Sequence, residues 1–298
     1  MIEAVRQLIG RARILILSGL VLCFGCHNLP NNGVPIYLHI DSPTVVSAYP
    51  LGSDSNYIPD VWVTSGSENI GAFEMPATIP VLAGGNVSFA ISAGIWDNGT
   101  VAAPVQYPFF RPDTFTILNA VPGHAYHHKP VYHYFAYTLN ALNADFETTN
   151  LFTNLSRWTD RQENNVFEGA GSGAILLPAS DSFIKAYQTI PVPVITNGRP
   201  AYVEINYKIS NPNMLMEVGL TATNYSGGSA SATDYSNVYL QGKDNLWRKA
   251  YLNFSNEIGT ANAQSNNQTY FQVYLKAYHD GKQPDTVFVD NVKLLYFQ

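Results

Sequence analysis

Residues 202–209 read YVEINYKI, and this stretch decides the fold class of the chain. Apolar and polar residues alternate along it, so Val203, Ile205 and Tyr207 point to one side of an extended strand. The polar residues between them point to the other side and predict a half-buried strand. Strands of this kind pair into sheets that pack face to face. The stretch therefore predicts a β-sandwich.

The same alternation recurs elsewhere. Residues 271–277 repeat it, and Gly, Pro and Asn bound most such segments, while no long stretch has the 3.6-residue period of a helix. Only 13% of the residues are charged, as is typical of a secreted β protein. The segments 225–237 and 256–268 are rich in Asn, Ser and Gly and are predicted to be polar loops. Further strands are predicted at 36–40, 61–64, 87–92 and 114–118.

The amino end has the composition of an export signal. Arginines precede an apolar run from Ile14 to Phe24, which is too short to span a bilayer. The following residues 22–26, LCFGC, resemble the lipobox of bacterial lipoproteins. The resemblance implies that residues 1–25 are a signal peptide and that Cys26 carries the lipid, palmitate included. The alternative is an ordinary secretory signal with Cys26 near the cut.

Residues 26–33 form a polar segment that we interpret as a tether. No Asp follows Cys26 directly, which by resemblance to Bacteroidetes-type and other Gram-negative lipoproteins implies the outer membrane. Whether the protein faces the periplasm or the cell surface stays open. Cleavage would leave one cysteine and hence no internal disulfide. The formal net charge is −6 without a basic patch, which argues against nucleic acid as a partner.

Two β-sandwich domains are predicted, at residues 34–138 and 143–298, with the boundary near 139–144. Within the first, residues 61–89 contain a strand, a Pro-Ala-Thr kink, a Leu-x-x-Gly turn and another strand. This order resembles PEGA-type β domains, which implies an envelope spacer or binding module. Trp62 lies on one of these strands, and the pattern does not decide which face of the strand its side chain occupies.

The second predicted domain opens with Asp-Phe-Glu at 145–147, has Trp247 in a middle strand and closes with Val-Asp-Asn-Val at 289–292. This order resembles jelly-roll carbohydrate-binding modules and implies a jelly roll in which Trp158 and Trp247 pack in the core. Exposed tyrosines stack on sugar rings. The candidate ligand-binding residues are Tyr225, Tyr235 and Tyr239, and the alternative is that they are turn and edge tyrosines.

Metal chemistry has two candidate places. The resemblance implies a structural Ca²⁺ bound by Glu147 and Asp290 where the first and last strands meet, because Ca²⁺ takes hard oxygen ligands. The competing account is that Asp290 is satisfied by hydrogen bonds from a backbone amide or a hydroxyl. Histidines at 124, 127, 128 and 133 lack the spacing of a metal site and are expected on the surface.

The sequence carries no catalytic motif: it has no Gly-x-Ser-x-Gly elbow, no phosphate loop and no His-Glu-x-x-His. We therefore expect no enzyme and no catalytic cofactor. The favoured hypothesis is a lipid-anchored, non-catalytic module that binds carbohydrate. The alternative is an accessory subunit that binds protein in an outer-membrane uptake or secretion complex. A glycosidase or lyase is the third hypothesis, resting on fold analogy alone.

Overall fold

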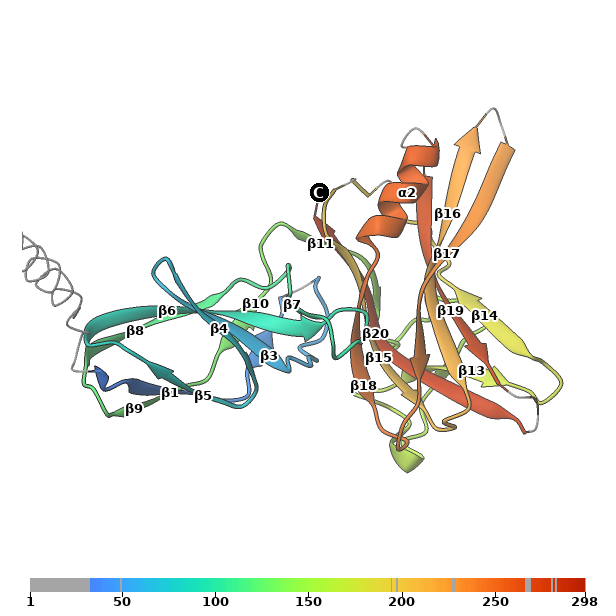
Figure 1. The fold of residues 1–298 in the computed structure, drawn as a ribbon. Helices are drawn as coiled ribbons and strands as arrows, with labels where there is room; N and C mark the ends of the chain where they lie inside the picture. Colours follow the sequence, from blue (N-terminus) through green and yellow to red (C-terminus); the bar gives the residue numbers. More distant parts are fainter. Residues whose placement is uncertain are drawn as a thin grey trace, which may run out of the picture.

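A computed structural model gives the fold, and it describes residues 33–48, 50–193, 195–196, 198–226, 229–265, 269–279, 281 and 283–297. These residues form two β-sandwiches, and one end of the first lies against the side of the second (Figure 1). Among the described elements, every regular one is a strand apart from one α-helix and one short 3-10 helix. The predicted all-β fold class is therefore confirmed.

The first sandwich is built from ten strands. They are β1 (Ile36–Ile40), β2 (Thr44–Val46), β3 (Asp60–Ser65), β4 (Glu68–Glu74), β5 (Ala77–Val81), β6 (Gly85–Trp96), β7 (Pro104–Gln106), β8 (Asp113–Ala120), β9 (Ala125–His128) and β10 (Val131–His133). One sheet has the order β5-β1-β9, and a second has the order β4-β3-β6-β7 with β8 also on β6. A small β10-β2 sheet lies beside them. The four strands predicted in this region are all present.

Alternation explains the core of this sandwich. Leu38 of β1 and Val61 and Val63 of β3 are fully buried and belong to one cluster. Trp62 lies between the two valines and so takes the opposite face of β3. The two sheets therefore pack through their inward positions, as face-to-face sheets do.

The second sandwich is larger. Its elements are β11 (Thr138–Ala144), β12 (Ser156–Trp158), η3 (Gln162–Asn164), β13 (Ser172–Leu177), β14 (Phe183–Tyr187), β15 (Ala201–Ile209), β16 (Leu215–Ser226), β17 (Ser229–Gln241), β18 (Arg248–Asn253), α2 (Ser255–Ser265), β19 (Thr269–Tyr278) and β20 (Asp285–Phe297). One sheet has the order β12-β13-β20-β15-β18, with β11 also paired to β20. The other has the order β14-β19-β16-β17.

The predicted inward positions fill the space between these sheets. Phe271, Val273 and Leu275 of β19 are fully buried, and so are Val203 and Ile205 of β15. All five belong to a single cluster. Each strand therefore presents its apolar side to the facing sheet, which is the arrangement that the alternation of residues 202–209 and 271–277 predicts.

The alternation of residues 202–209 predicts that the outward side of β15 is exposed, and this is wrong. All nine residues of β15 are buried, and Glu204 and Lys208 have no exposed surface. The first sandwich covers Glu204, since Tyr107 and Tyr134 donate hydrogen bonds to its carboxylate. Residues 163–165, at the end of η3, cover Lys208 and accept hydrogen bonds from its ammonium group. Alternation identifies the two faces of a strand, but it does not reveal what packs on them.

Three other expectations need correction. The expected boundary at 139–144 is part of β11, which pairs with β20 and so belongs to the second sandwich. The polar segment 225–237 lies mainly in β16 and β17, which pair with each other along their length. The segment 256–268 contains most of α2, whose Ile258 and Ala261 are spaced three apart and buried against the core. These two buried positions anchor the short helix to the core, but among so many polar residues they give no clear helical pattern in the sequence.

The predicted signal peptide, Cys26 and the tether up to residue 32 lie outside the described residues. Among the helices that the structure describes, none combines the length and the apolar character that a membrane crossing requires. The lipid anchor therefore stays a prediction.

Candidate functional site

The outward side of the β14-β19-β16-β17 sheet is rich in aromatic rings. Val273 and Leu275 point into the core, so the positions between and beside them point outward. We call this side the tyrosine face. Its aromatic members are Phe183 and Tyr187 of β14, Tyr239 of β17, and Tyr270, Tyr274 and Tyr278 of β19. Phe183, Tyr187 and Tyr239 are 47%, 43% and 56% exposed, which makes them accessible to a ligand.

A glycine makes the centre of this face possible. Tyr274 lies directly opposite Gly219 in the β16–β19 pairing, and Tyr274 is almost fully buried although it points outward. A Cβ atom on residue 219 would meet the Tyr274 ring at 2.3–2.5 Å. The tyrosine ring therefore lies flat across the glycine, because only hydrogen at that position leaves room for it.

A buried carboxylate fixes two of the tyrosines. The Tyr274 and Tyr278 hydroxyls each donate a hydrogen bond of 2.5 Å to Glu217, one to each carboxylate oxygen. Burial raises the pKa of Glu217, but these hydrogen bonds outweigh it, so the pKa lies below its usual value. Glu217 is therefore ionised at neutral pH and holds both rings in place.

Two lysines complete the face. The Lys185 ammonium lies 4.2 Å from the centre of the Tyr274 ring and 2.6 Å from an Asp234 carboxylate oxygen. The Lys276 ammonium lies 4.2 Å from the centre of the Phe183 ring. Cations over aromatic rings are held by the ring quadrupole. The face thus combines positioned rings with positioned charged groups, and a cavity of about 530 Å³ adjoins it along β14.

Of the predicted ligand-binding tyrosines, only Tyr239 has a described side chain on this face. Tyr235 packs against the core and donates a hydrogen bond to Gln264 of α2. Where β16 pairs with β17, Val218 lies opposite Val238 and Gly219 lies opposite Ser236. Asn237 is therefore an extra residue of β17 with no opposite residue on β16. This β-bulge reverses the alternation, and Tyr235 and Tyr239 therefore lie on opposite faces. Tyr225 belongs to β16, but its side chain lies outside what the structure describes.

The tryptophans of the second sandwich were predicted in the core, and this is wrong for both. Trp158 and Trp247 are partly exposed. Trp158 and Phe288 meet edge to face, and the Trp247 indole donates a hydrogen bond of 2.7 Å to the Asn164 carbonyl. Both pack beside the β12-β13-β20-β15-β18 sheet, and the space between the two sheets is filled mainly by aliphatic residues, methionine and phenylalanine.

The histidines lie at the surface of the first sandwich, as expected: His124 and His127 are exposed, and His128 and His133 are partly exposed. His127 stacks on His39 with 4.6 Å between ring centres. His128 stacks on Phe115 and lies 2.5 Å from an Asp113 carboxylate oxygen. Among the described residues, no group of three or more His, Cys, Asp or Glu is placed to hold a metal ion.

The predicted calcium ligands have partners within the chain. Asp290 accepts hydrogen bonds from the Ser172 hydroxyl at 2.6 Å and from the Asn291 amide at 2.8 Å. Burial raises its pKa to about 7, although both hydrogen bonds oppose this shift. A Glu147 carboxylate oxygen accepts a hydrogen bond from the Ala170 amide. The competing account of Asp290, satisfaction by an amide and a hydroxyl, thus agrees with the structure.

An arginine also argues against a cation at this place. The Arg157 guanidinium donates hydrogen bonds of 2.6 Å to the backbone carbonyls of Phe146 and Glu147. Those carbonyls are among the oxygens that a calcium ion beside Glu147 would use. Both carbonyls thus already have a partner, and the structural calcium stays a prediction.

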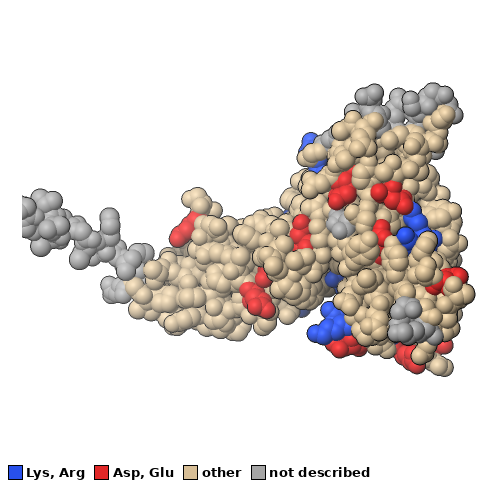
Figure 2. Space-filling view, turned by 45° about the vertical axis from the view of Figure 1, so that its right-hand side comes forward, with Lys and Arg blue, Asp and Glu red and all other residues tan. Residues whose placement is uncertain are grey.

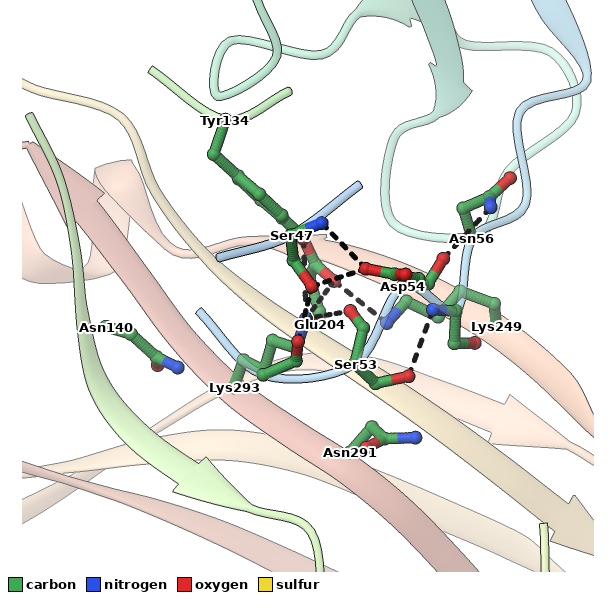
Figure 3. A network of polar contacts seen from close by, with 12 residues as sticks. Ser47, Ser53, Asp54, Asn56, Tyr134, Asn140, Glu204, Lys249, Asn291 and Lys293 are labelled. Carbon is green, nitrogen blue, oxygen red and sulfur yellow. Dashed lines mark hydrogen bonds and ion pairs between the residues drawn. The ribbon is translucent and has the colours of Figure 1, made fainter. Parts of the chain in front are cut away.

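A second polar cluster lies where the two sandwiches meet (Figure 3). The Glu204 carboxylate lies 2.8 Å from the Lys249 ammonium and 3.9 Å from that of Lys293. Tyr107 and Tyr134 of the first sandwich donate hydrogen bonds to it at 2.6 and 2.9 Å. Burial raises the pKa of Glu204, but the two lysines outweigh it and bring the pKa to about 2. An ionised glutamate thus joins the two halves of the molecule.

Comparison with known proteins finds similarity only to solved structures. The sequence matches no family model and no curated protein. One similar structure is CBM61 in complex with β-1,4-galactotriose, with a TM-score of 0.33 and 13% identity over 52% of this chain and 97% of that one. Another is the CBM22-1 xylan-binding domain from Paenibacillus barcinonensis Xyn10C, with a TM-score of 0.37 and 12% identity over 53% of this chain and 95% of that one.

Proposed function

We propose that this protein is a membrane-anchored, non-catalytic module whose tyrosine face binds carbohydrate. The observation that carries the proposal is the set of accessible rings, Phe183, Tyr187 and Tyr239, on one face of a single sheet. Pyranose rings have apolar C–H faces that stack on aromatic side chains, while their hydroxyls need fixed polar partners. Lys185 and Asp234, paired at 2.6 Å, supply such partners on the same face.

The charge of the surface is compatible with a neutral ligand. The charged side chains visible in Figure 2 are scattered among uncharged ones and form no extended patch of one sign. On the tyrosine face itself, Lys185 pairs with Asp234, while Lys276 lies over the Phe183 ring. The Glu217 carboxylate accepts hydrogen bonds from two tyrosine hydroxyls. A neutral polysaccharide, bound through stacking and hydrogen bonds, suits this face better than a highly charged polymer.

The binding test uses the chain from Gly33 onward, purified without the predicted signal peptide, on affinity gels that contain soluble polysaccharides. Galactan and xylan are the first ligands to try, followed by a wider glycan array. We expect retardation by at least one neutral polysaccharide. Absence of retention on every glycan contradicts the proposal, and release of soluble sugar from a retained glycan contradicts its non-catalytic part.

Single substitutions locate the binding surface. Tyr187→Ala and Tyr239→Ala each remove one exposed ring and should weaken binding about 5- to 150-fold, since one stacking ring contributes about 1–3 kcal/mol by alanine substitution in other stacking sites. Tyr37→Ala is the matched control, because Tyr37 is a 40% exposed strand tyrosine in the first sandwich. Equal loss in all three variants would place binding elsewhere.

The anchor part of the proposal rests on Cys26 and its lipobox-like surroundings. Acyl chains on this cysteine would hold the protein on a membrane, by resemblance the outer membrane, and several chains hold firmly where one does not. The test is metabolic labelling with palmitate in a bacterial host. Wild-type protein should carry the label and partition into detergent, and Cys26→Ser should do neither. Labelled Cys26→Ser protein would overturn the anchor.

A further inference from the structure

A cleft of about 380 Å³ lies at the junction of the two sandwiches, away from the tyrosine face. We call it the junction cleft. Its lining residues come from both halves of the chain: Tyr57 and Trp96 belong to the first sandwich, and Phe167, Trp247 and Arg248 to the second. Pockets that hold small ligands have volumes of about 300–1,000 Å³, so this cleft has room for one sugar-sized group.

Two pairs of rings form its walls. Tyr57 and Trp96 meet edge to face with 5.3 Å between ring centres. Phe167 and Trp247 are tilted, also with 5.3 Å between centres, and the hydrogen bond from the Trp247 indole to Asn164 fixes that ring further. Rings that are already packed lose little freedom when a ligand stacks on them. The cleft therefore offers apolar surfaces that are positioned in advance.

Arg248 gives the cleft a positive charge. Its Nε atom is buried and has no hydrogen-bond partner among the described residues. In the part of the chain that the structure describes, no Asp or Glu forms an ion pair with it. Lys249 differs, since it pairs with Glu204 at 2.8 Å. A buried donor without a partner is unfavourable, and a guanidinium is best satisfied by a carboxylate that accepts two hydrogen bonds.

Polar groups beside the rings can serve hydroxyls. The Asn206 amide donates a hydrogen bond of 2.9 Å to the Ser55 hydroxyl, and both residues line the cleft. The Asn56 side chain lines it as well. A purely aromatic acid would leave these amide and hydroxyl groups unused. A ligand with an apolar face, several hydroxyls and one carboxylate uses all of the chemistry present.

We propose that the junction cleft is a second binding site, which takes a uronic acid residue of an acidic saccharide. The sugar ring packs between the aromatic walls, and its carboxylate binds the Arg248 guanidinium. The site is distinct from the tyrosine face in position and in the charge of its ligand, so it stands or falls independently of the neutral-glycan proposal. Because residues of both sandwiches line the cleft, the site exists only when the two halves are joined as they are here.

The test is a titration of the chain from Gly33 onward with digalacturonic acid. Binding is measured by isothermal titration calorimetry and by tryptophan fluorescence, which should respond because Trp96 and Trp247 both line the cleft. Galactobiose, the neutral counterpart, is the ligand control. We expect the acidic disaccharide to bind at least 10-fold more tightly, with an affinity that falls as NaCl is added. Equal binding of the two sugars, or no binding of the acid, overturns the proposal.

Variants locate the acidic site. Arg248→Gln should weaken binding of the acid roughly 10- to 100-fold, as expected for loss of hydrogen bonds to a charged group. Arg248→Lys should retain part of the affinity. Arg199→Gln is the matched control, because Arg199 lines a different groove. Circular dichroism and melting curves confirm that each variant is folded. Unchanged affinity in folded Arg248→Gln overturns the assignment, whereas loss of neutral-glycan binding in Tyr239→Ala tests only the tyrosine face.

Discussion

The Tyr107 hydroxyl donates a hydrogen bond of 2.6 Å to the Glu204 carboxylate, although 97 residues separate them along the chain. Tyr107 follows β7 of the first sandwich, and Glu204 lies in the middle of β15 in the second. The Tyr107 ring also packs on the Tyr251 ring, with 4.9 Å between ring centres. The two sandwiches thus share a buried aromatic and ionic contact, which favours a fixed orientation over a flexible linkage.

Removing one partner of this buried cluster should destabilise the whole chain. Lys249→Met deletes the ammonium nearest to Glu204, and only 2% of the Lys249 side chain is exposed. Breaking a buried ion pair on one side costs about 3–5 kcal/mol. Because Lys293 still faces Glu204 at 3.9 Å, we expect the lower end of that range. Urea unfolding measures the change, with Lys243→Met as a control at an exposed lysine. A loss below about 1 kcal/mol in Lys249→Met would show that water reaches Glu204.

The same cluster predicts a specific response to acid. The pKa of Glu204 is about 2 in the folded protein, below its usual value near 4.5, so the folded state binds the proton less readily than the unfolded state. The stabilisation is therefore present above pH 4.5 and is lost as the pH falls toward 2. In Lys249→Met the folded pKa rises, so acid unfolding should begin at a higher pH. Circular dichroism against pH checks this, and identical midpoints would contradict it.

How much the sequence reveals is clearest in β15. Alternation at 202–209 predicts which residues face the opposite sheet, and Val203 and Ile205 do so. It also predicts an exposed polar side, and this is wrong, since Tyr107 and Tyr134 cover Glu204. Packing between sandwiches depends on contacts far apart in sequence, for which a period of two carries no signal. A glutamate and a lysine alternating with large apolar residues are compatible with either outcome.

The tyrosine face was only partly predictable, and for a different reason. Tyr235 and Tyr239 are four residues apart, a spacing that puts two strand residues on the same side. The extra residue Asn237 reverses the alternation between them, and nothing in its neighbourhood marks a bulge. The rings of β14 and β19 were missed, because Phe183 and Tyr278 come together only through strand pairing.

Asp290, which the sequence suggested as a calcium ligand, predicts how the stability of the protein depends on pH. Its pKa of about 7 exceeds the usual value near 3.8, so the folded state holds the proton more tightly between these two pH values. Stability from this group is therefore present below about pH 4 and is lost as the pH rises through 7. Asp290→Asn should remove that dependence and be more stable than wild type at pH 8, by roughly 1–3 kcal/mol.

The calcium test compares melting temperatures with EDTA and with added Ca²⁺. Because Arg157 already donates to the carbonyls of Phe146 and Glu147, we expect no difference for the wild-type protein. A rise with Ca²⁺ that disappears in Asp290→Asn would show that the ion binds and that Arg157 moves aside. Mg²⁺ at equal concentration controls for ionic strength.

Gly219→Ala should disrupt the tyrosine face from beneath. The new methyl group would meet Tyr274 ring atoms at 2.3–2.5 Å, closer than carbon atoms approach without repulsion, so the ring must leave its place over the strand. The Tyr274 hydroxyl then loses its 2.5 Å hydrogen bond to Glu217, and the Lys185 ammonium loses its contact with the Tyr274 ring. Overpacking of this kind costs about 1–3 kcal/mol. We expect that destabilisation in urea unfolding, together with weaker binding of any neutral glycan that the wild-type protein retains.

Gly259→Ala is the matched control for this change. Gly259 lies in α2 with open space where a Cβ would stand, and alanine favours a helix over glycine by up to about 1 kcal/mol. The same chemical substitution should therefore stabilise the protein at one position and destabilise it at the other. If Gly219→Ala binds glycan as the wild type does and unfolds at the same urea concentration, the flat seating of Tyr274 is not what shapes the binding face. A binding defect without loss of stability would instead mean that the ring moves freely but that its position is what the ligand requires.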